Sequence, residues 1–217
     1  MTGVSQVNAT IYVVEDDPVA AAFAAAAAQV AGWPAKVFSS AEPFLTDIAH
    51  SCRGCLILDL QMEGMTGLQL QSELKERGCL LPVIVVSGQA DVPTAVAAMK
   101  QAAFDYFEKP VALETLAASI RRAVAFDATQ SAGRADAEIV QARFARLSPR
   151  ERQVMGSVVA GMANKQIAAK LGLSEKTIEV HRGSVMRKMQ VESVPDLVRA
   201  SLLCMPAEST ADQPAGR

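Results

Sequence analysis

The feature that most constrains this chain is the alternation of short apolar runs with helical stretches over its first 125 residues. The apolar runs lie at 11–14, 35–38, 55–58, 83–86 and 105–107, and the helical stretches lie at 18–30, 41–49, 68–77, 93–100 and 113–125. Strands that alternate with helices of this length form a parallel sheet with helices on both faces. We therefore predict an α/β fold with a doubly wound, five-stranded parallel sheet.

Polar side chains stand at the ends of these runs. Glu15 and Asp16 follow the first run, Asp59 follows the third, Ser87 follows the fourth and Lys109 lies just after the fifth. The carboxyl ends of parallel strands meet at one edge of a sheet, so we expect these side chains to gather there. Carboxylates in such a group can hold a hard cation such as Mg²⁺, or one can attack phosphorus. Each residue alone has a plainer interpretation, so the prediction depends on the whole set.

The charge of the chain is unevenly distributed. Residues 1–125 hold 8 basic and 13 acidic side chains, a net charge of −5, whereas residues 141–205 hold 11 basic and 5 acidic side chains, a net charge of +6. A basic second half is typical of a domain that binds a polyanion such as nucleic acid. Charge alone does not separate this interpretation from chance variation of the surface.

The sequence offers no sign of export or of a redox pair. The N-terminus lacks a signal-peptide pattern, and the longest apolar run, 19–28, is too short to cross a bilayer. We therefore expect a cytoplasmic protein with no membrane partner. Cys52 and Cys55 form a C-x-x-C pair, but Cys55 begins a strand-like run and no second pair completes a zinc site.

The pattern changes after residue 125. Residues 126–142 lose the strand and helix alternation and are predicted to form a linker, helical near its ends, whereas the polar tail at 206–217 is predicted to be disordered. Between them the periodicity is helical only, with helices expected at 149–160, 164–171, 175–189 and 194–203. A glycine-containing turn joins the second of these helices to the third, which predicts an all-α helix-turn-helix domain at 143–205.

The first half resembles the receiver domain of two-component response regulators. The matching segments are VVEDDP at 13–18, LDLQM at 58–62, GMTG at 64–67, VVSG at 85–88 and DYFEKP at 105–110. The resemblance implies a flavodoxin-like receiver at 8–125. It further implies that Asp59 is the phosphoacceptor, that Lys109 pairs with the phosphate, and that Ser87 and Tyr106 are the switch residues.

The same resemblance implies a Mg²⁺ site. Its expected ligands are Glu15, Asp16, Asp59 and the backbone carbonyl of Gln61. In the family the peptide bond between the matching lysine and proline, here at 109–110, is cis. The chain departs from the family at two positions, with a glutamate at 63 in place of a common proline and an alanine at 102 in place of a common glycine.

The second half resembles a LuxR-type DNA-binding domain. The matching segments are LSPRER at 147–152, NKQIA at 164–168, LGLS at 171–174 and TIEVHR at 177–182. The two resemblances together imply the NarL/FixJ class. Exposed residues of the second helix of the motif are the expected DNA contacts, namely Lys176, Thr177, Glu179, Val180 and Arg182. Contacts to phosphates, which position a protein without specifying sequence, are expected from Lys165, Arg187 and Lys188.

These resemblances imply a DNA-binding response regulator and not an enzyme. Phosphotransfer from a sensor histidine kinase to Asp59 would control binding of promoter DNA, through a homodimer because symmetric half-sites favour a two-fold dimer. RNA polymerase is a further candidate partner. One alternative makes the receiver a phosphate-independent interaction module. A phosphatase with Asp59 as nucleophile would require a second acid where Gln61 stands, and no P-loop motif occurs.

Overall fold

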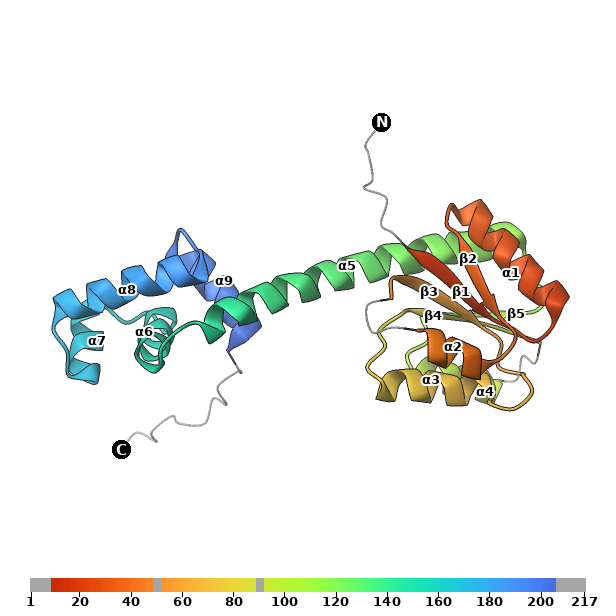
Figure 1. Ribbon diagram of the computed structural model, residues 1–217, viewed down its shortest axis with the longest axis horizontal. Helices are drawn as coiled ribbons and strands as arrows, with labels where there is room; N and C mark the ends of the chain where they lie inside the picture. Colours follow the sequence, from red (N-terminus) through yellow and green to blue (C-terminus); the bar gives the residue numbers. More distant parts are fainter. Residues whose placement is uncertain (1–8, 49–51, 89–91, 206–217) are drawn as a thin grey trace. The chain divides into compact units, whose positions relative to one another are not determined.

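The computed structural model describes residues 9–48, 52–88 and 92–205, and the chain divides into two compact units, Met1–Ser131 and Ala132–Arg217 (Figure 1). The predicted tail at 206–217 and the last residue of the helix predicted at 41–49 lie outside the described residues.

The first unit is built on a five-stranded parallel sheet. Its strands are β1 (Thr10–Val14), β2 (Ala35–Phe38), β3 (Gly54–Leu58), β4 (Val83–Ser87) and β5 (Asp105–Glu108), in the order β2-β1-β3-β4-β5. All four pairings are parallel. Each predicted apolar run forms a strand, and the predicted doubly wound sheet is confirmed.

Helices cover both faces of this sheet, as Figure 1 shows. They are α1 (Pro18–Ala31), α2 (Ala41–Asp47), α3 (Gly67–Glu76), α4 (Val92–Lys100) and the first part of α5 (Leu113–Ala145). Successive side chains of a strand point to opposite faces. Val13 and Ile57 therefore pack in the core with α1 and α5, whereas Val14 and Leu58 pack in a second core with α2, α3 and α4.

Helix α5 continues without interruption from Leu113 to Ala145. It passes through the whole of 126–142, so the structure differs from the prediction that helical order lapses inside this segment. Residues 126–142 contain no proline, only one glycine and many alanines, which favour a helix intrinsically. The lapse in apolar periodicity showed only that this part of the helix buries no continuous stripe.

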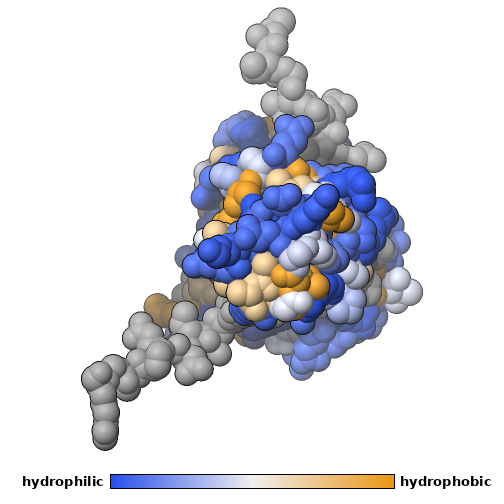
Figure 2. Space-filling model, turned by 90° about the vertical axis from the view of Figure 1, so that its left-hand side faces the viewer, coloured by the Kyte–Doolittle hydropathy of each residue, from blue (hydrophilic) through white to orange (hydrophobic). Residues whose placement is uncertain are grey.

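Up to residue 205, where the described part of the second unit ends, its regular elements are all helices. They are the end of α5, then α6 (Pro149–Val159), α7 (Asn164–Leu171), α8 (Glu175–Met189) and α9 (Val194–Cys204). Their core is formed by buried side chains from each of the last four helices, among them Met155, Ile167, Ile178 and Leu197. The face of this unit seen in Figure 2 is mostly hydrophilic, with smaller apolar areas between the polar side chains. The predicted all-α second domain is confirmed.

Within the described residues, no helix combines the length and the apolar character needed to cross a membrane. None of the four cysteines forms a disulfide bond. Cys55 lies inside β3, where burial raises the pKa of its thiol first and the negative charge of Asp127 adds to the shift. A thiol of raised pKa stays protonated and is a poor nucleophile.

Candidate functional site

The sheet order brings the predicted acidic residues to neighbouring strand ends. Strand β1 pairs directly with β3, with Val14 opposite Leu58. Glu15 and Asp16 follow β1, and Asp59 follows β3. From β1 the sheet extends to β2 on one side and to β3 on the other, so this pair of strands marks the point where the chain order reverses. In open α/β sheets, ligands bind outside the carboxyl ends of the strands at this point.

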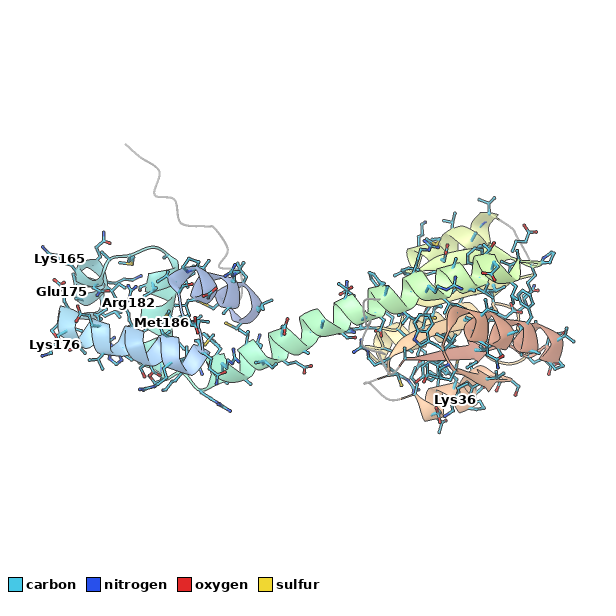
Figure 3. All side chains as sticks on the ribbon, turned by 90° about the horizontal axis from the view of Figure 1, so that it is seen from above. Lys36, Lys165, Glu175, Lys176, Arg182 and Met186 are labelled. Carbon is cyan, nitrogen blue, oxygen red and sulfur yellow. The ribbon has the colours of Figure 1, made fainter. Side chains whose placement is uncertain are left out.

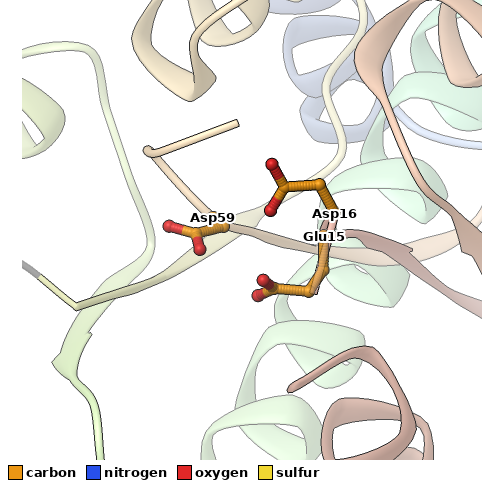
Figure 4. Close-up of side chains that lie close together, drawn as sticks. All are labelled: Glu15, Asp16 and Asp59. Atoms are coloured by element: carbon orange, nitrogen blue, oxygen red, sulfur yellow. The ribbon is translucent and has the colours of Figure 1, made fainter. Parts of the chain in front are cut away.

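The carboxylates of Glu15, Asp16 and Asp59 converge there (Figure 4). One oxygen from each of them lies within 4.8 Å of the others. Glu15 and Asp59 are buried, at 6% and 5% exposure, whereas Asp16 is exposed. Hard oxygen donors grouped in this way suit a small divalent cation, and the exposed carboxylate leaves one side of the group open to solvent.

Lys109 joins two of these carboxylates. Its ammonium Nζ lies 2.7 Å from Asp59 Oδ2 and 2.8 Å from Glu15 Oε2. Burial acts to lower the pKa of Lys109, but the hydrogen bonds that it donates to Asp59 and Glu15 outweigh burial and raise its pKa. Burial also raises the pKa of Glu15, with Lys109 opposing the shift and Asp59 adding to it. The peptide bond between Lys109 and Pro110 is cis, as predicted.

The loop after β3 fixes the acids through its backbone. The amide of Gln61 donates to Asp59 Oδ1 at 3.0 Å, so both oxygens of Asp59 have a partner. Glu63 stands where the family commonly has a proline. Its backbone amide donates to Asp16 Oδ2 at 3.1 Å and so contacts the acidic cluster. The predicted role of the Gln61 carbonyl as a metal ligand stays a prediction.

Gly67 closes the same loop. A Cβ atom at this position would lie only 2.3 Å from the backbone oxygen of Asp59, and the amide of Gly67 donates to the carbonyl of Leu60 at 3.1 Å. The start of α3 therefore packs directly on the backbone that carries Asp59, and only glycine fits this approach.

The predicted switch residues lie on the adjoining strands. Ser87 is fully buried at the end of β4, and its carbonyl accepts a hydrogen bond of 2.9 Å from the amide of Lys109. Tyr106 is half-buried on β5, opposite Val85. The two residues thus lie on neighbouring strands, and their switching role stays a prediction.

An open cleft of about 670 Å³ surrounds the cluster. Its lining combines the acids and Lys109 with apolar side chains of α1 such as Val19 and Phe23. Asp17, which also lines the cleft, has a structural task, because its Oδ1 accepts hydrogen bonds from the amides of Ala20 and Val19 at 2.8 and 2.7 Å. These bonds lower the pKa of Asp17, which is the N-cap of α1.

The second unit carries the predicted helix-turn-helix. Helix α7 ends at Leu171, Gly172 adopts a left-handed φ of 65°, and α8 begins after Ser174. The hydroxyl of Ser174 accepts a hydrogen bond of 3.1 Å from the amide of Thr177 and thereby caps α8. The turn between the two helices is therefore set by one glycine and one cap, and α8 presents its outer side to solvent.

Five of the predicted DNA contacts are exposed, four of them on α8 and one on α7. Lys165, Lys176, Glu179, Val180 and Arg187 are exposed, and Val180 reaches 67% exposure, which is high for an apolar side chain. Figure 3 shows Lys165 and Lys176 at the end of the unit formed by α7 and the start of α8, and Arg182 between these two helices. An exposed apolar residue between basic ones suits a surface that packs on DNA bases and phosphates.

Two of the predicted contacts are held inside the unit. Arg182 donates to Asn164 Oδ1 at 3.0 Å and so ties α8 to α7. The ammonium of Lys188 lies 2.7 Å from Glu151 Oε2, and Glu151 is buried at 5% exposure. The structure therefore gives Lys188 an internal partner in place of a phosphate, and its predicted phosphate contact stays a prediction without structural support.

Comparison with known families finds one family for each unit. Residues 11–121 match the family described as the response regulator receiver domain. Residues 145–201 match the bacterial regulatory proteins of the luxR family. The chain belongs to the response regulators of the NarL/FixJ class.

Individual relatives resemble this response regulator over most of its length. It is 41% identical over 194 residues to the response regulator protein TmoT of Ectopseudomonas mendocina, covering 89% of this chain and 88% of TmoT. It is 40% identical over 193 residues to the transcriptional regulatory protein FixJ of Azorhizobium caulinodans, covering 89% and 92% of the two chains.

Solved structures extend the likeness to the fold. The structure of the response regulator StyR matches with a TM-score of 0.81 at 32% identity, over 90% of this chain and 99% of that one. Full-length FixJ from B. japonicum matches with a TM-score of 0.54 at 37% identity, over 90% and 96% of the two chains.

The regulator's structure brings together four of the predicted phosphorylation residues, namely Asp59, Glu15, Asp16 and Lys109. Sequence reasoning did not assign roles to Gly67 or to Glu151 as the partner of Lys188. The GMTG motif was a signal for the first. For the second, Ser148 and Glu151 have the spacing of a capping box at the start of α6, and this spacing accounts for one bond of Glu151. Glu151 also bonds to Lys188, which is 37 positions away in the chain. A local sequence pattern does not reveal a contact of that separation.

Proposed function

We propose that Asp59 accepts a phosphoryl group from a sensor histidine kinase and that this step controls binding of promoter DNA by the second unit. The observation that carries the proposal is the meeting of Asp59, Lys109 and the Glu15 carboxylate within hydrogen-bond distance at neighbouring strand ends. In the reaction, a carboxylate oxygen of Asp59 attacks phosphorus, the bond from phosphorus to the histidine nitrogen breaks, and an acyl phosphate forms.

The residues around Asp59 fit the demands of this reaction. Lys109 and the Gln61 amide each hold one oxygen of Asp59, which fixes the carboxylate for attack. We assign Mg²⁺ binding to Glu15, Asp16, Asp59 and the Gln61 carbonyl, because these are the hard oxygen ligands that the ion prefers. When bound, Mg²⁺ neutralises charge on the transferring phosphoryl oxygens. The Lys109 ammonium supplies a further positive charge next to the Asp59 carboxylate.

The switch follows from the position of Ser87 and Tyr106 on adjacent strands. A phosphoryl group on Asp59 adds negative charge and acceptor oxygens beside the end of β4. The Ser87 hydroxyl is drawn toward it, and the half-buried ring of Tyr106 moves into the space that is vacated. Both strands and α4 form the surface that changes, and pairing of two chains on symmetric half-sites is the proposed consequence.

The phosphoacceptor assignment is tested with Asp59→Asn, which keeps the size of the side chain and removes its nucleophilic charge. With acetyl phosphate and Mg²⁺ as the phosphodonor, the full-length variant should lose labelling, measured by intact mass. Asp136→Asn is the matched control, because Asp136 is an exposed aspartate on α5. Undiminished labelling of the Asp59 variant would end the assignment.

For DNA recognition we assign base-edge contacts to residues of α8, namely Lys176, Thr177, Glu179, Val180 and Arg182. We assign phosphate contacts to Lys165 and Arg187. The exposure of Lys165, Lys176, Val180 and Arg187 and the capped start of α8 support this assignment. The same proposal places the protein in the cytoplasm with its promoter, where a DNA-bound dimer can also meet RNA polymerase.

Lys176→Ala tests the DNA-facing side without disturbing an internal hydrogen bond of the described residues. Duplexes are first selected by the wild-type protein from a random library, and affinity is then measured by electrophoretic shift. We expect a loss of roughly 5- to 150-fold if Lys176 contacts a base. The control is Lys75→Ala, an exposed lysine of α3 in the receiver. Equal affinity of both variants and the wild type would refute this face.

A further inference from the structure

One buried carboxylate of the receiver has no part in phosphotransfer. Asp127 lies on α5 past the predicted end of the domain at residue 125, and only 1% of it is exposed. Its Oδ2 accepts hydrogen bonds from Arg53 Nε at 2.9 Å and from the Gly54 amide at 3.0 Å. The hydroxyl of Ser131, one turn later, donates to Oδ1 at 3.3 Å.

These contacts join α5 to the start of β3. Gly54 is the first residue of that strand and has a φ of 124°. A Cβ at this position would lie 2.0 Å from the carbonyl oxygen of Thr10, so the backbone of Gly54 is confined between β1 and α5. The opposite end of β3 leads directly into Asp59. The phosphoacceptor strand is therefore tied to α5 at the end remote from the reaction.

Asp127 lies where α5 passes from the receiver core to an exposed segment. Before it, Leu116, Ile120 and Val124 are buried in the receiver core, whereas after it residues 132 and 133 are exposed. Burying a carboxylate is costly unless charged and polar partners compensate for the lost water. A leucine or alanine would fill a helix face at less cost, so the carboxylate is best explained by the backbone amide and guanidinium that it holds.

We propose that Asp127 is a positioning residue that locks the receiver end of the linker helix to strand β3, and that the phosphorylation state of Asp59 reaches residues 132–145 through this lock. The second half of this statement rests on the proposed function. A helix is stiff over a few turns, so contacts that hold α5 at Asp127 also hold the turns that follow it. Without the lock, the last turns before residue 132 fray and receiver and linker lose their coupling.

Hydrogen exchange of the full-length protein tests the lock directly. In Asp127→Ala, backbone amides of residues 126–131 should exchange roughly 5- to 150-fold faster than in the wild type, since a buried hydrogen-bond network is removed. Asp127→Asn retains an acceptor for the Gly54 amide and should recover most of the protection. Asp136→Ala, an exposed aspartate of the same helix, should exchange like the wild type. The fluorescence of Trp33 shows whether each receiver is folded.

A second arm tests the coupling. With acetyl phosphate and Mg²⁺, the wild type should become labelled and change its exchange at 132–145, whereas Asp127→Ala should become labelled equally and show no such change. Wild-type exchange at 126–131 in the alanine variant would overturn the lock. A retained response at 132–145 in that variant, or none in the labelled wild type, would overturn the coupling. If the wild type takes no label, the proposed function and the coupling fail together. Hydrogen exchange at 126–131 still tests the lock in that case.

Discussion

Replacing Glu151 by alanine should destabilise the DNA-binding unit selectively. Glu151 accepts hydrogen bonds from the amide of Ser148 at 2.7 Å, from Ser184 Oγ at 2.7 Å and from Lys188 Nζ at 2.7 Å. These hydrogen bonds lower the pKa of Glu151 to about 2. The bond from Lys188 has the largest effect, followed by those from the Ser148 amide and the Ser184 hydroxyl. One carboxylate thus connects the start of α6 to the middle and the end of α8.

The magnitude follows from those bonds. A hydrogen bond to a charged group contributes about 1.5–3 kcal/mol to the free energy of unfolding. The side chain of Lys188 is 35% exposed and Ser184 is half-buried, so both partners regain some water when Glu151 is removed. We therefore expect a loss near the cost of one to two such bonds, about 3 kcal/mol. In a unit of this size that corresponds to a fall in Tm of roughly 12–24 °C.

The chain's single tryptophan allows the two units to be followed separately. Trp33 lies in the receiver, so its fluorescence reports unfolding of the first unit, whereas far-UV circular dichroism reports helices of both. Glu151→Ala should lower the midpoint of the dichroism transition and leave the fluorescence midpoint unchanged. Glu192→Ala, an exposed glutamate between α8 and α9, is the matched control.

The pH dependence has a defined sign. The folded pKa of Glu151, about 2, lies below its ordinary value of 4.5. Its contribution to stability is therefore fully present above pH 4.5 and is lost as the pH falls toward 2. The alanine variant should lack this part of the profile. Equal Tm values for the variant and the control, or a parallel fall in the fluorescence midpoint, would refute the reasoning.

Three further predictions concern the receiver. Lys109→Met should lower the rate of Asp59 labelling by acetyl phosphate by roughly 10²-fold or more, as expected for a lost charge contact to the transferring group, and a wild-type rate measured by intact mass would contradict this. Gly67→Ala should destabilise the receiver by about 1–3 kcal/mol in urea unfolding followed by Trp33 fluorescence, because the added Cβ would lie 2.3 Å from a backbone oxygen; an unchanged midpoint would count against the close approach. Because burial raises the pKa of Glu15 above its ordinary value of 4.5, Mg²⁺ affinity should fall on acidification before an ordinary glutamate would be protonated, and calorimetric titration of the protein with Mg²⁺ across pH checks this. An affinity that is flat down to pH 4.5 would show that Glu15 is no ligand.

Much of the acidic site could be read from the sequence because parallel strands have a simple geometry. Apolar runs such as the one before Asp59 become strands, and their carboxyl ends meet at one edge. That rule places Glu15, Asp59 and Lys109 together without any knowledge of side-chain packing. It does not give partners, and only the structure shows that Lys109 spans Glu15 and Asp59 and that the Gln61 amide holds the other oxygen.

The helix-turn-helix could be predicted for a different reason. Caps and turn glycines act locally, so Ser174 and Gly172 mark the ends of their helices in the sequence itself. Whether a basic residue on those helices faces solvent is a tertiary matter. Lys176 and Lys188 look alike in the sequence, yet one is exposed and the other is paired with a buried glutamate.

By itself, the sequence determined the alternation of strands and helices, the edge at which the acids gather and the turn that presents α8. These depend on periodicity, strand direction and capping, all of which act over a few residues. The tertiary structure alone decided that 126–142 is helical and that Asp127 is buried against Gly54, 73 residues away. A polar segment with good helix propensity is compatible with coil or helix, and the choice lies with distant groups that a local pattern does not contain.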